Sequence, residues 1–238
     1  MDNLERKRKL RQLLLAVLLP WVVLLVVRAG ILCTDGETDP DAFYHAKLAE
    51  QGPSVFLAKK FPALTMSIWK DHFSNKEMGF HFILWGLHRV GSAVGLKTSC
   101  PFHYYTMFCL ALLLTVIAVT LIRWNIVCPW YYTLLFAGVY YAFTTRLVFL
   151  RAYLLSMSLF VLVICLLSAE ELRNSKWRLA WLFIIGILFS WCYSNPHFIL
   201  FPTVAFAIAE FLADRNWRRL PILPSVALLG VITGLCLH

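Results

Sequence analysis

The chain has 238 residues, of which 60% are hydrophobic, and its mean hydropathy is +0.70. Soluble domains of this length have a much lower apolar share, so the composition excludes an ordinary water-soluble fold and indicates that lipid surrounds most of the surface. The formal net charge is +9. Lys and Arg are concentrated in short gaps between apolar runs, which orients a membrane protein and argues against nucleic acid as a partner.

The apolar runs are long and show no alternation with period two. In hydrocarbon every backbone amide must find its partner inside the segment, so such runs favour helices over a β-barrel. The predicted fold class is therefore all-α, a polytopic transmembrane helix bundle that forms one domain over residues 1 to 238.

The first run covers residues 13 to 27 and follows a basic stretch, residues 2 to 12, with five Lys or Arg. This order is typical of a signal-anchor helix with a cytoplasmic N-terminus. A cleaved signal peptide is the alternative, but no small-residue cleavage pattern precedes Cys33.

Six further apolar runs make seven predicted spans in an integral, multi-pass protein, for which the bacterial inner membrane is the expected location. Threading the spans from an inside N-terminus puts the basic gaps around Arg123, Arg173 and Arg215 inside, whereas the outer turn at residues 194 to 197 has no Lys or Arg. The later runs lie at about 104 to 122, 126 to 145, 152 to 168, 178 to 194, 198 to 213 and 221 to 237.

A long loop at residues 33 to 103 lies on the opposite, periplasmic or luminal side, and loops of this length usually carry function. Asp39 before Pro40 predicts a helix start, and Gly52-Pro53 predicts its end. A second juxtamembrane helix is predicted from Ser74, with Glu77 as its capping-box partner, to about Val94.

Two cysteines bound this loop. Cys33 and Cys100 stand at its two ends, where a disulfide can form if that side is oxidising. Two free thiols are the alternative.

The densest polar cluster of the chain opens the loop, with Asp35, Glu37, Asp39, Asp41 and His45. Crowded carboxylates repel one another, which suits either a proton-accepting base or hard oxygen ligands for a divalent cation such as Mg²⁺ or Mn²⁺. Asp41 and His45 are four residues apart and share a face of the predicted helix. A helix cap followed by a solvated acidic turn explains the cluster equally well.

Farther along the loop, Asp71 is a second carboxylate that could join Asp39 as a metal ligand. His72 and His81 lack the spacing of a helical metal pair, and for both we expect an interfacial position.

Two arginines flank the outer ends of the third and fourth predicted spans, where the positive-inside rule disfavours them. Arg146 and Arg151 suit a lipid-linked phosphate, because guanidinium forks match phosphate oxygens. Contact with ordinary lipid headgroups is the alternative. His197 is the one ionisable residue of the outer turn and could approach the same phosphate, although a hydrated turn histidine is the simpler interpretation.

The first helix followed by a long acidic loop resembles the GT-C superfamily of polytopic glycosyltransferases. Glu37, Asp39 and Pro40, then Tyr44 and Ala-Glu-Gln-Gly at residues 49 to 52, resemble the first loop of the oligosaccharyltransferase catalytic subunit. The Asp-Pro-Asp core also resembles the acidic motif of dolichol-phosphate-mannose-dependent mannosyltransferases. Motif similarity covers about residues 33 to 85, and the other helices match in topology only.

The resemblance implies transfer of a sugar from a polyprenyl-(pyro)phosphate donor to an acceptor that the sequence leaves unidentified. Asp39 or Asp41 would be the base or metal-positioning carboxylate, supported by Glu37, His45 and Asp71, while Arg146, Arg151 and His197 would face the lipid phosphate. No WWDxG-type acceptor motif occurs, which argues against a complete oligosaccharyltransferase.

Three further expectations concern the context of the chain. It ends at His238 directly after an apolar run, so we expect a fragment or a shortened member of the superfamily, with a missing C-terminal part or further membrane subunits as partners. A non-catalytic membrane assembly subunit and a transporter are the rival functions. A transporter should place ionisable residues at the bilayer midplane, whereas the charges of this chain cluster at span ends.

Overall fold

The structure is a computed structural model, and it describes a large part of the chain as helices joined by short turns, with no strand in that part. The all-α prediction is thereby confirmed for these residues. They are residues 7–8, 10–19, 21–22, 40–61, 66–95, 102–138, 146–147 and 149–237.

The chain divides into two compact units that alternate along the sequence. The first unit comprises Met1–Ala42 and Phe102–Cys165, and the second comprises Phe43–Pro101 and Leu166–His238.

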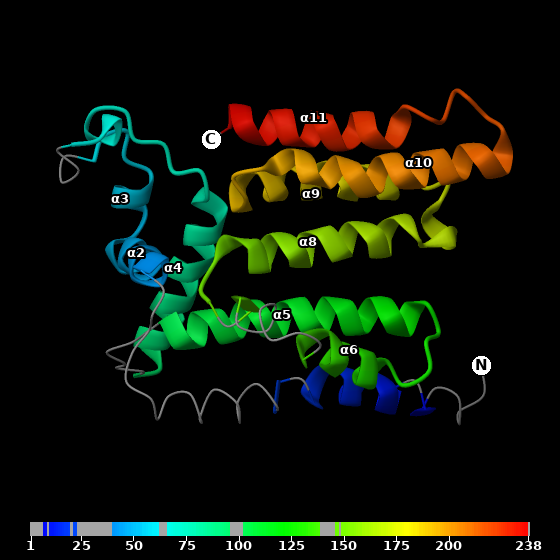
Figure 1. The fold of residues 1–238 in the computed structure, drawn as a ribbon, viewed down its shortest axis with the longest axis horizontal. Coiled ribbons are helices and arrows are strands. Elements are labelled where there is room, and N and C mark those ends of the chain that lie inside the picture. Colours follow the sequence, from blue (N-terminus) through cyan, green and yellow to red (C-terminus); the bar gives the residue numbers. More distant parts are fainter. Residues whose placement is uncertain are drawn as a thin grey trace. The chain divides into compact units, whose positions relative to one another are not determined.

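Among the described residues of the first unit, helix α5 supplies more buried side chains than any other helix, including Tyr105, Leu113 and Leu114. Helix α6 packs beside α5 (Figure 1). The indole N–H of Trp21 lies 3.4 Å from the Thr115 hydroxyl of α5, which ties the N-terminal helix to the same core. The main helices of this unit are Leu10–Leu19, α5 (Phe102–Arg123), α6 (Pro129–Gly138) and nearly all of α8 (Ala152–Leu167).

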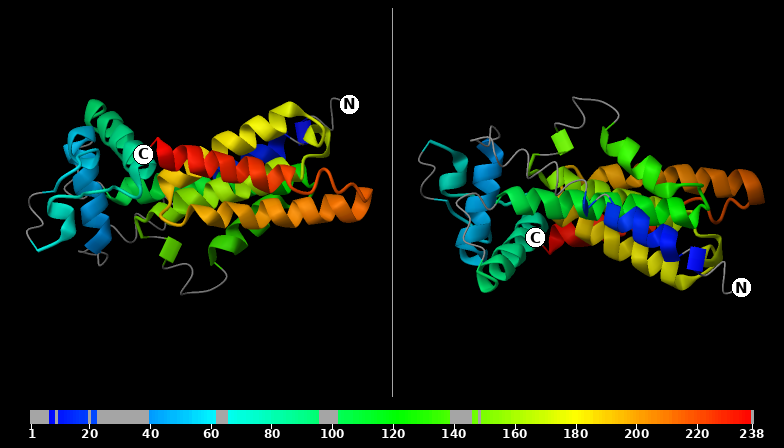
Figure 2. Two further views of the ribbon diagram at one scale, coloured as in Figure 1. Left: turned by 90° about the horizontal axis from the view of Figure 1, so that it is seen from above. Right: turned by 90° about the horizontal axis from the view of Figure 1, so that it is seen from below.

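In the second unit, three long helices, α9, α10 and α11, run alongside one another, as both views of Figure 2 show. Helix α4 packs against the end of α9, where a Cβ atom on Gly79 would lie 2.8 Å from the Cβ of Trp191. The elements of this unit are most of α2 (Pro40–Gln51), α3 (Pro53–Phe56), η1 (Ile68–Lys70), α4 (Met78–Ala93), η2 (Glu170–Leu172), α9 (Lys176–Cys192), η3 (Pro196–Ile199), α10 (Leu200–Asp214) and α11 (Ile222–Cys236).

Glycines allow α9 and α11 to approach backbone to backbone. A Cβ atom on Gly186 would lie 2.9 Å from the Ala227 carbonyl oxygen and 3.1 Å from the Gly230 Cα, and one on Gly230 would overlap the Phe183 carbonyl. Close approach of this kind is what small residues provide at helix interfaces. The Trp191 indole adds a 2.9 Å hydrogen bond to the Gly234 carbonyl.

A buried arginine near the start of α9 connects this helix to α10 and to the end of α8. Arg178 is 1% exposed, and its guanidinium forms an ion pair with Glu210 of α10 at 2.7 Å. It also donates to the Leu167 carbonyl at 3.0 Å and to the Arg173 carbonyl at 3.2 Å. Since a buried cation is tolerated only when it is paired and hydrogen-bonded, these three contacts are what allow Arg178 to sit there.

Outside the loop of residues 33 to 103, the described α-helices fall in the apolar runs of the sequence, but several are shorter than a full span requires. Two of them are long and apolar enough to cross a membrane by length and composition, Tyr104–Arg123 and Pro196–Asp214. Three shorter apolar helices accompany them: Leu10–Leu19, Ala152–Leu167 and Ile222–Cys236.

The two loop helices test the sequence predictions directly. Helix α2 runs from Pro40 to Gln51 and ends at Gly52, whose φ of 80° suits glycine, so this prediction is confirmed. The prediction that α4 begins at Ser74 with a capping box is wrong, because α4 begins at Met78 and its N-cap, Glu77, makes no side-chain cap bond. The Glu77 carboxylate instead faces His45 at 3.9 Å.

Replacing Gly230 with alanine is expected to lower the free energy of unfolding by about 1–3 kcal/mol, because the added methyl group forces α9 and α11 apart. Gly86→Ala on α4 is the matched control, since a Cβ there meets no atom within 4 Å. It should be neutral or stabilising by up to about 1 kcal/mol. Equilibrium unfolding of the purified chain measures both, and equal effects would contradict the close-contact interpretation.

Replacing Arg178 with methionine is expected to cost about 3–5 kcal/mol, because Glu210 is left without its partner in a largely buried position. The double variant Arg178→Met/Glu210→Leu should recover most of this loss, since it removes both charges.

The exposed pair Lys47–Glu50 is the control for the buried one. Lys47→Met should change stability by about 0.5 kcal/mol or less. If the double variant is no more stable than Arg178→Met alone, the buried carboxylate is not the source of the cost.

Candidate functional site

The structure brings together two residues that the sequence marks for separate reasons. Asp41, in the first turn of α2, forms an ion pair with Arg151, which directly precedes α8 and lies 110 residues away in the chain. Both residues belong to the first unit. The Asp41 side chain is 49% exposed and that of Arg151 is 35% exposed, so the pair stands at the surface and can be reached by a ligand.

Arg146 lies in the same unit as this pair. Its side chain is exposed, and its carbonyl accepts a hydrogen bond from the Tyr153 hydroxyl on α8. This bond ties the backbone of Arg146 to the helix that begins directly after Arg151.

In the second unit, His45 belongs to a buried polar network. Its Nδ1 lies 2.9 Å from Nε2 of His81 on α4, and His81 Nδ1 lies 3.0 Å from the Asn75 Oδ1. Asn75 in turn donates from Nδ2 to the Phe56 carbonyl at 3.1 Å. The network therefore links α2, the end of α3 and the start of α4.

The hydrogen-bond pattern assigns the protons of this network. Because the Asn75 amide nitrogen donates to Phe56, its Oδ1 is an acceptor and the facing His81 Nδ1 carries a hydrogen. In a neutral His81, Nε2 is then the acceptor, so His45 donates from Nδ1. The remaining His45 nitrogen, Nε2, faces the Glu77 carboxylate at 3.9 Å.

Burial keeps His81 neutral. Desolvation, with a smaller contribution from the charge of neighbouring His45, lowers the pKa of His81 from 6.5 to about 3. The Phe80 ring packs edge-on against His45 with centroids 5.1 Å apart, and the Tyr44 ring packs edge-on against His81 at 5.9 Å. The prediction that His81 is interfacial is therefore wrong, because this residue is only 1% exposed.

The other predicted loop and turn residues are at the surface of the second unit. Asp71 and His72 follow η1 and are both exposed. His197 is exposed on η3, where its ring stacks on Phe198 with centroids 4.9 Å apart. A hydrated position for His197 agrees with this geometry.

Several predicted residues lie outside the described part of the chain. They are Asp35, Glu37 and Asp39 of the acidic cluster and the cysteine pair Cys33 and Cys100. Within the described part, no three His, Cys, Asp or Glu side chains come close enough to hold a metal ion. The metal role of Asp39 and Asp71 stays a prediction.

Comparison with protein-family models, with curated proteins and with solved structures finds no match for this chain.

The sequence analysis missed two polar partners. Asn75 and Glu210 were not singled out, although each binds a buried charged or ionisable side chain, His81 and Arg178 respectively. For Glu210 a signal existed, since it is a lone carboxylate near the end of an apolar run that faces a basic gap. For Asn75 no pattern in the sequence points to His81.

Stability is expected to depend on pH through His81. Its pKa is about 3 in the folded chain and near 6.5 when unfolded, so between these values the unfolded state binds more protons. The free energy of unfolding should therefore fall as the pH drops from about 6.5 towards 3, by up to about 1.4 kcal/mol per pH unit. When the free energy of unfolding is measured across this pH window, it should change less with pH for His81→Gln than for the wild type.

His72→Gln is the matched control, because His72 belongs to the same loop and is exposed. It should keep the steep pH dependence of the wild type. A His81→Gln profile as steep as that of the control would show that another group causes the dependence.

Proposed function

We propose that the chain is a membrane glycosyltransferase of the GT-C type, with seven spans, that transfers a sugar from a polyprenyl-(pyro)phosphate donor to an acceptor on the outer face. The ion pair between Asp41 and Arg151 carries this proposal. It joins the acidic loop motif, where a base is expected, to the arginine expected to face the donor phosphate.

The chemistry of the pair suits phosphate departure. A guanidinium has five N–H donors in a planar fork, so Arg151 can hold the Asp41 carboxylate and a phosphate oxygen together. Arg146, exposed a few residues earlier, supplies a second guanidinium for a pyrophosphate. Fixed cations of this kind stabilise the charge that develops on a leaving phosphate.

The proposed reaction breaks one bond and forms one. An acceptor hydroxyl or amide attacks the anomeric carbon of the donor sugar, and the bond from that carbon to the phosphate oxygen breaks, releasing the polyprenyl (pyro)phosphate. The acceptor proton passes to the carboxylate of Asp39 or Asp41. The electron pair of the broken bond stays on the leaving phosphate, beside Arg151.

The partners implied are the lipid bilayer, the polyprenyl-linked sugar donor and an acceptor on the outer side. A supporting role of Glu37 and a divalent cation belong to the same proposal. The localisation proposed is the bacterial inner membrane, with the N-terminus in the cytoplasm.

Asp41→Asn is expected to lower sugar transfer at least about a hundredfold, because it removes the carboxylate that would accept the acceptor's proton and that pairs with Arg151. Membranes containing the chain would be incubated with labelled polyprenyl-phosphate mannose, polyprenyl-phosphate glucose or a polyprenyl-pyrophosphate oligosaccharide, together with a membrane extract as acceptor source. Transferred label and protein abundance would be measured together. Glu171→Gln is the control, since Glu171 is an exposed carboxylate outside the loop motif.

A charge exchange separates catalysis from a structural ion pair. The double variant Asp41→Arg/Arg151→Asp keeps an ion pair between the two positions but reverses it. A purely structural pair would be restored by this exchange, so full transfer by the double variant would refute the proposal. An assembly subunit or a transporter predicts that Asp41→Asn leaves transfer unchanged at normal abundance.

A further inference from the structure

Cations gather at one end of α9 and in the connection between α10 and α11, all within the second unit. Six Arg or Lys side chains occur between residues 173 and 178 and between residues 215 and 219. They differ in their surroundings: Arg215 and Arg218 are exposed, whereas Arg178 is buried and paired. Three others, Arg173, Lys176 and Arg219, line a common hollow.

This hollow has a volume of about 190 Å³ and a strongly positive lining. Glu210 is the one carboxylate among the residues that line it, and its charge is balanced by Arg178 at 2.7 Å. Three cations therefore line the hollow, and two of them also pair with Asp214, Arg173 at 2.5 Å and Arg219 at 4.0 Å. The lining consists of Arg173, Asn174, Ser175, Lys176, Leu179, Glu210, Arg219 and Ile222.

Neighbouring bonds hold these cations in place. Arg219 donates to the Asn174 side chain at 3.1 Å, and Arg173 donates to Asp214. Within the described part of the chain, the buried Nε–H of Arg173 has no acceptor. Helix α9 also begins here, with Ser175 as its N-cap, and a helix start favours an anion.

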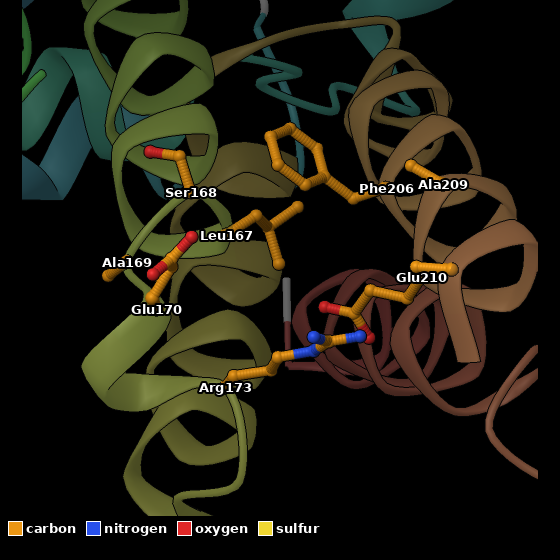
Figure 3. Close-up of a pocket in the computed structure, with 9 residues that line it drawn as sticks. Leu167, Ser168, Ala169, Glu170, Arg173, Phe206, Ala209 and Glu210 are labelled. Atoms are coloured by element: carbon orange, nitrogen blue, oxygen red, sulfur yellow. The ribbon is translucent and has the colours of Figure 1, made fainter.

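A second, larger hollow of about 330 Å³ shares Arg173 and Glu210 with the first. Figure 3 shows these two side chains toward one end of it, while Leu167 and Phe206 lie farther along. Ala169, Ala209 and Ala213 complete its apolar wall, and Ser168 and Glu170 line its polar edge. The polar and apolar parts of a single ligand would thus find separate places on either side of Arg173.

We propose that the two hollows form one binding site for a phosphate ester with an apolar tail. The phosphate lies between Arg173, Lys176 and Arg219, and the tail lies against Leu167 and Phe206. Guanidinium and ammonium groups are the side chains that hold phosphate oxygens most strongly. This site is separate from Asp41 and Arg151, and it stands whether or not the chain transfers sugar.

Lys176→Gln/Arg219→Gln is the variant that tests the site, because both side chains line the smaller hollow. The full chain would be placed in phosphatidylcholine bilayers containing about one part in five phosphatidylglycerol, and the bound phosphatidylglycerol would be measured by native mass spectrometry. The variant should retain at least about tenfold less of this lipid than the wild type, since two charge-assisted contacts are lost.

Arg215→Gln/Arg218→Gln is the matched control. It removes the same charge from the same end of the unit, but neither residue lines either of the two hollows described above. The control should retain phosphatidylglycerol as the wild type does. Equal losses in both variants would show general attraction to a basic surface and would overturn the proposal, as would no loss in either.

Glycerol 3-phosphate distinguishes a lipid ligand from a soluble phosphate. Because it lacks a tail, it should displace phosphatidylglycerol poorly, and Phe206→Ser should weaken lipid retention without changing the binding of glycerol 3-phosphate. If glycerol 3-phosphate binds as tightly as the lipid, the tail assignment is wrong.

Discussion

The ion pair of Arg178 with Glu210 is the interaction on which the second unit depends. A guanidinium that is 1% exposed loses its hydration, and it regains the lost contacts from Glu210, the Leu167 carbonyl and the Arg173 carbonyl. These partners lie on α10, at the end of α8 and just before α9. The pair also balances the carboxylate shared by both hollows, so the positive character of the smaller hollow depends on this buried contact.

The sequence predicted the positions of the long helices well, because each apolar run must satisfy its own backbone. Helix α2 was predicted at both ends, since Pro40 and Gly52 act through local backbone preferences. The start of α4 was missed because Glu77, expected as a cap for Ser74, faces His45 instead. The contact between α9 and α11 could not be predicted from the sequence, since glycine spacing in one helix does not identify the partner helix.

The candidate site was predicted in its parts but not in its pairing. Asp41 was singled out by the crowding of carboxylates and Arg151 by its place at an outer span end, and both criteria are local. Their ion pair depends on how two distant segments fold together. The position of His81 was predicted wrongly for the same reason. Residue spacing within α4 does not show that His81 meets His45 of α2 and Asn75.

The glycine contact between α9 and α11 has a consequence for the order in which the unit can assemble during synthesis. Ribosomes deliver α9 first, then α10, and α11 only afterwards. Glu210 therefore emerges in time to neutralise Arg178 before α11 has been made. The face of α9 at Gly186, in contrast, stays uncovered until Gly230 of α11 has been synthesised. A nascent chain that lacks α11 therefore exposes this face to incorrect contacts with other helices.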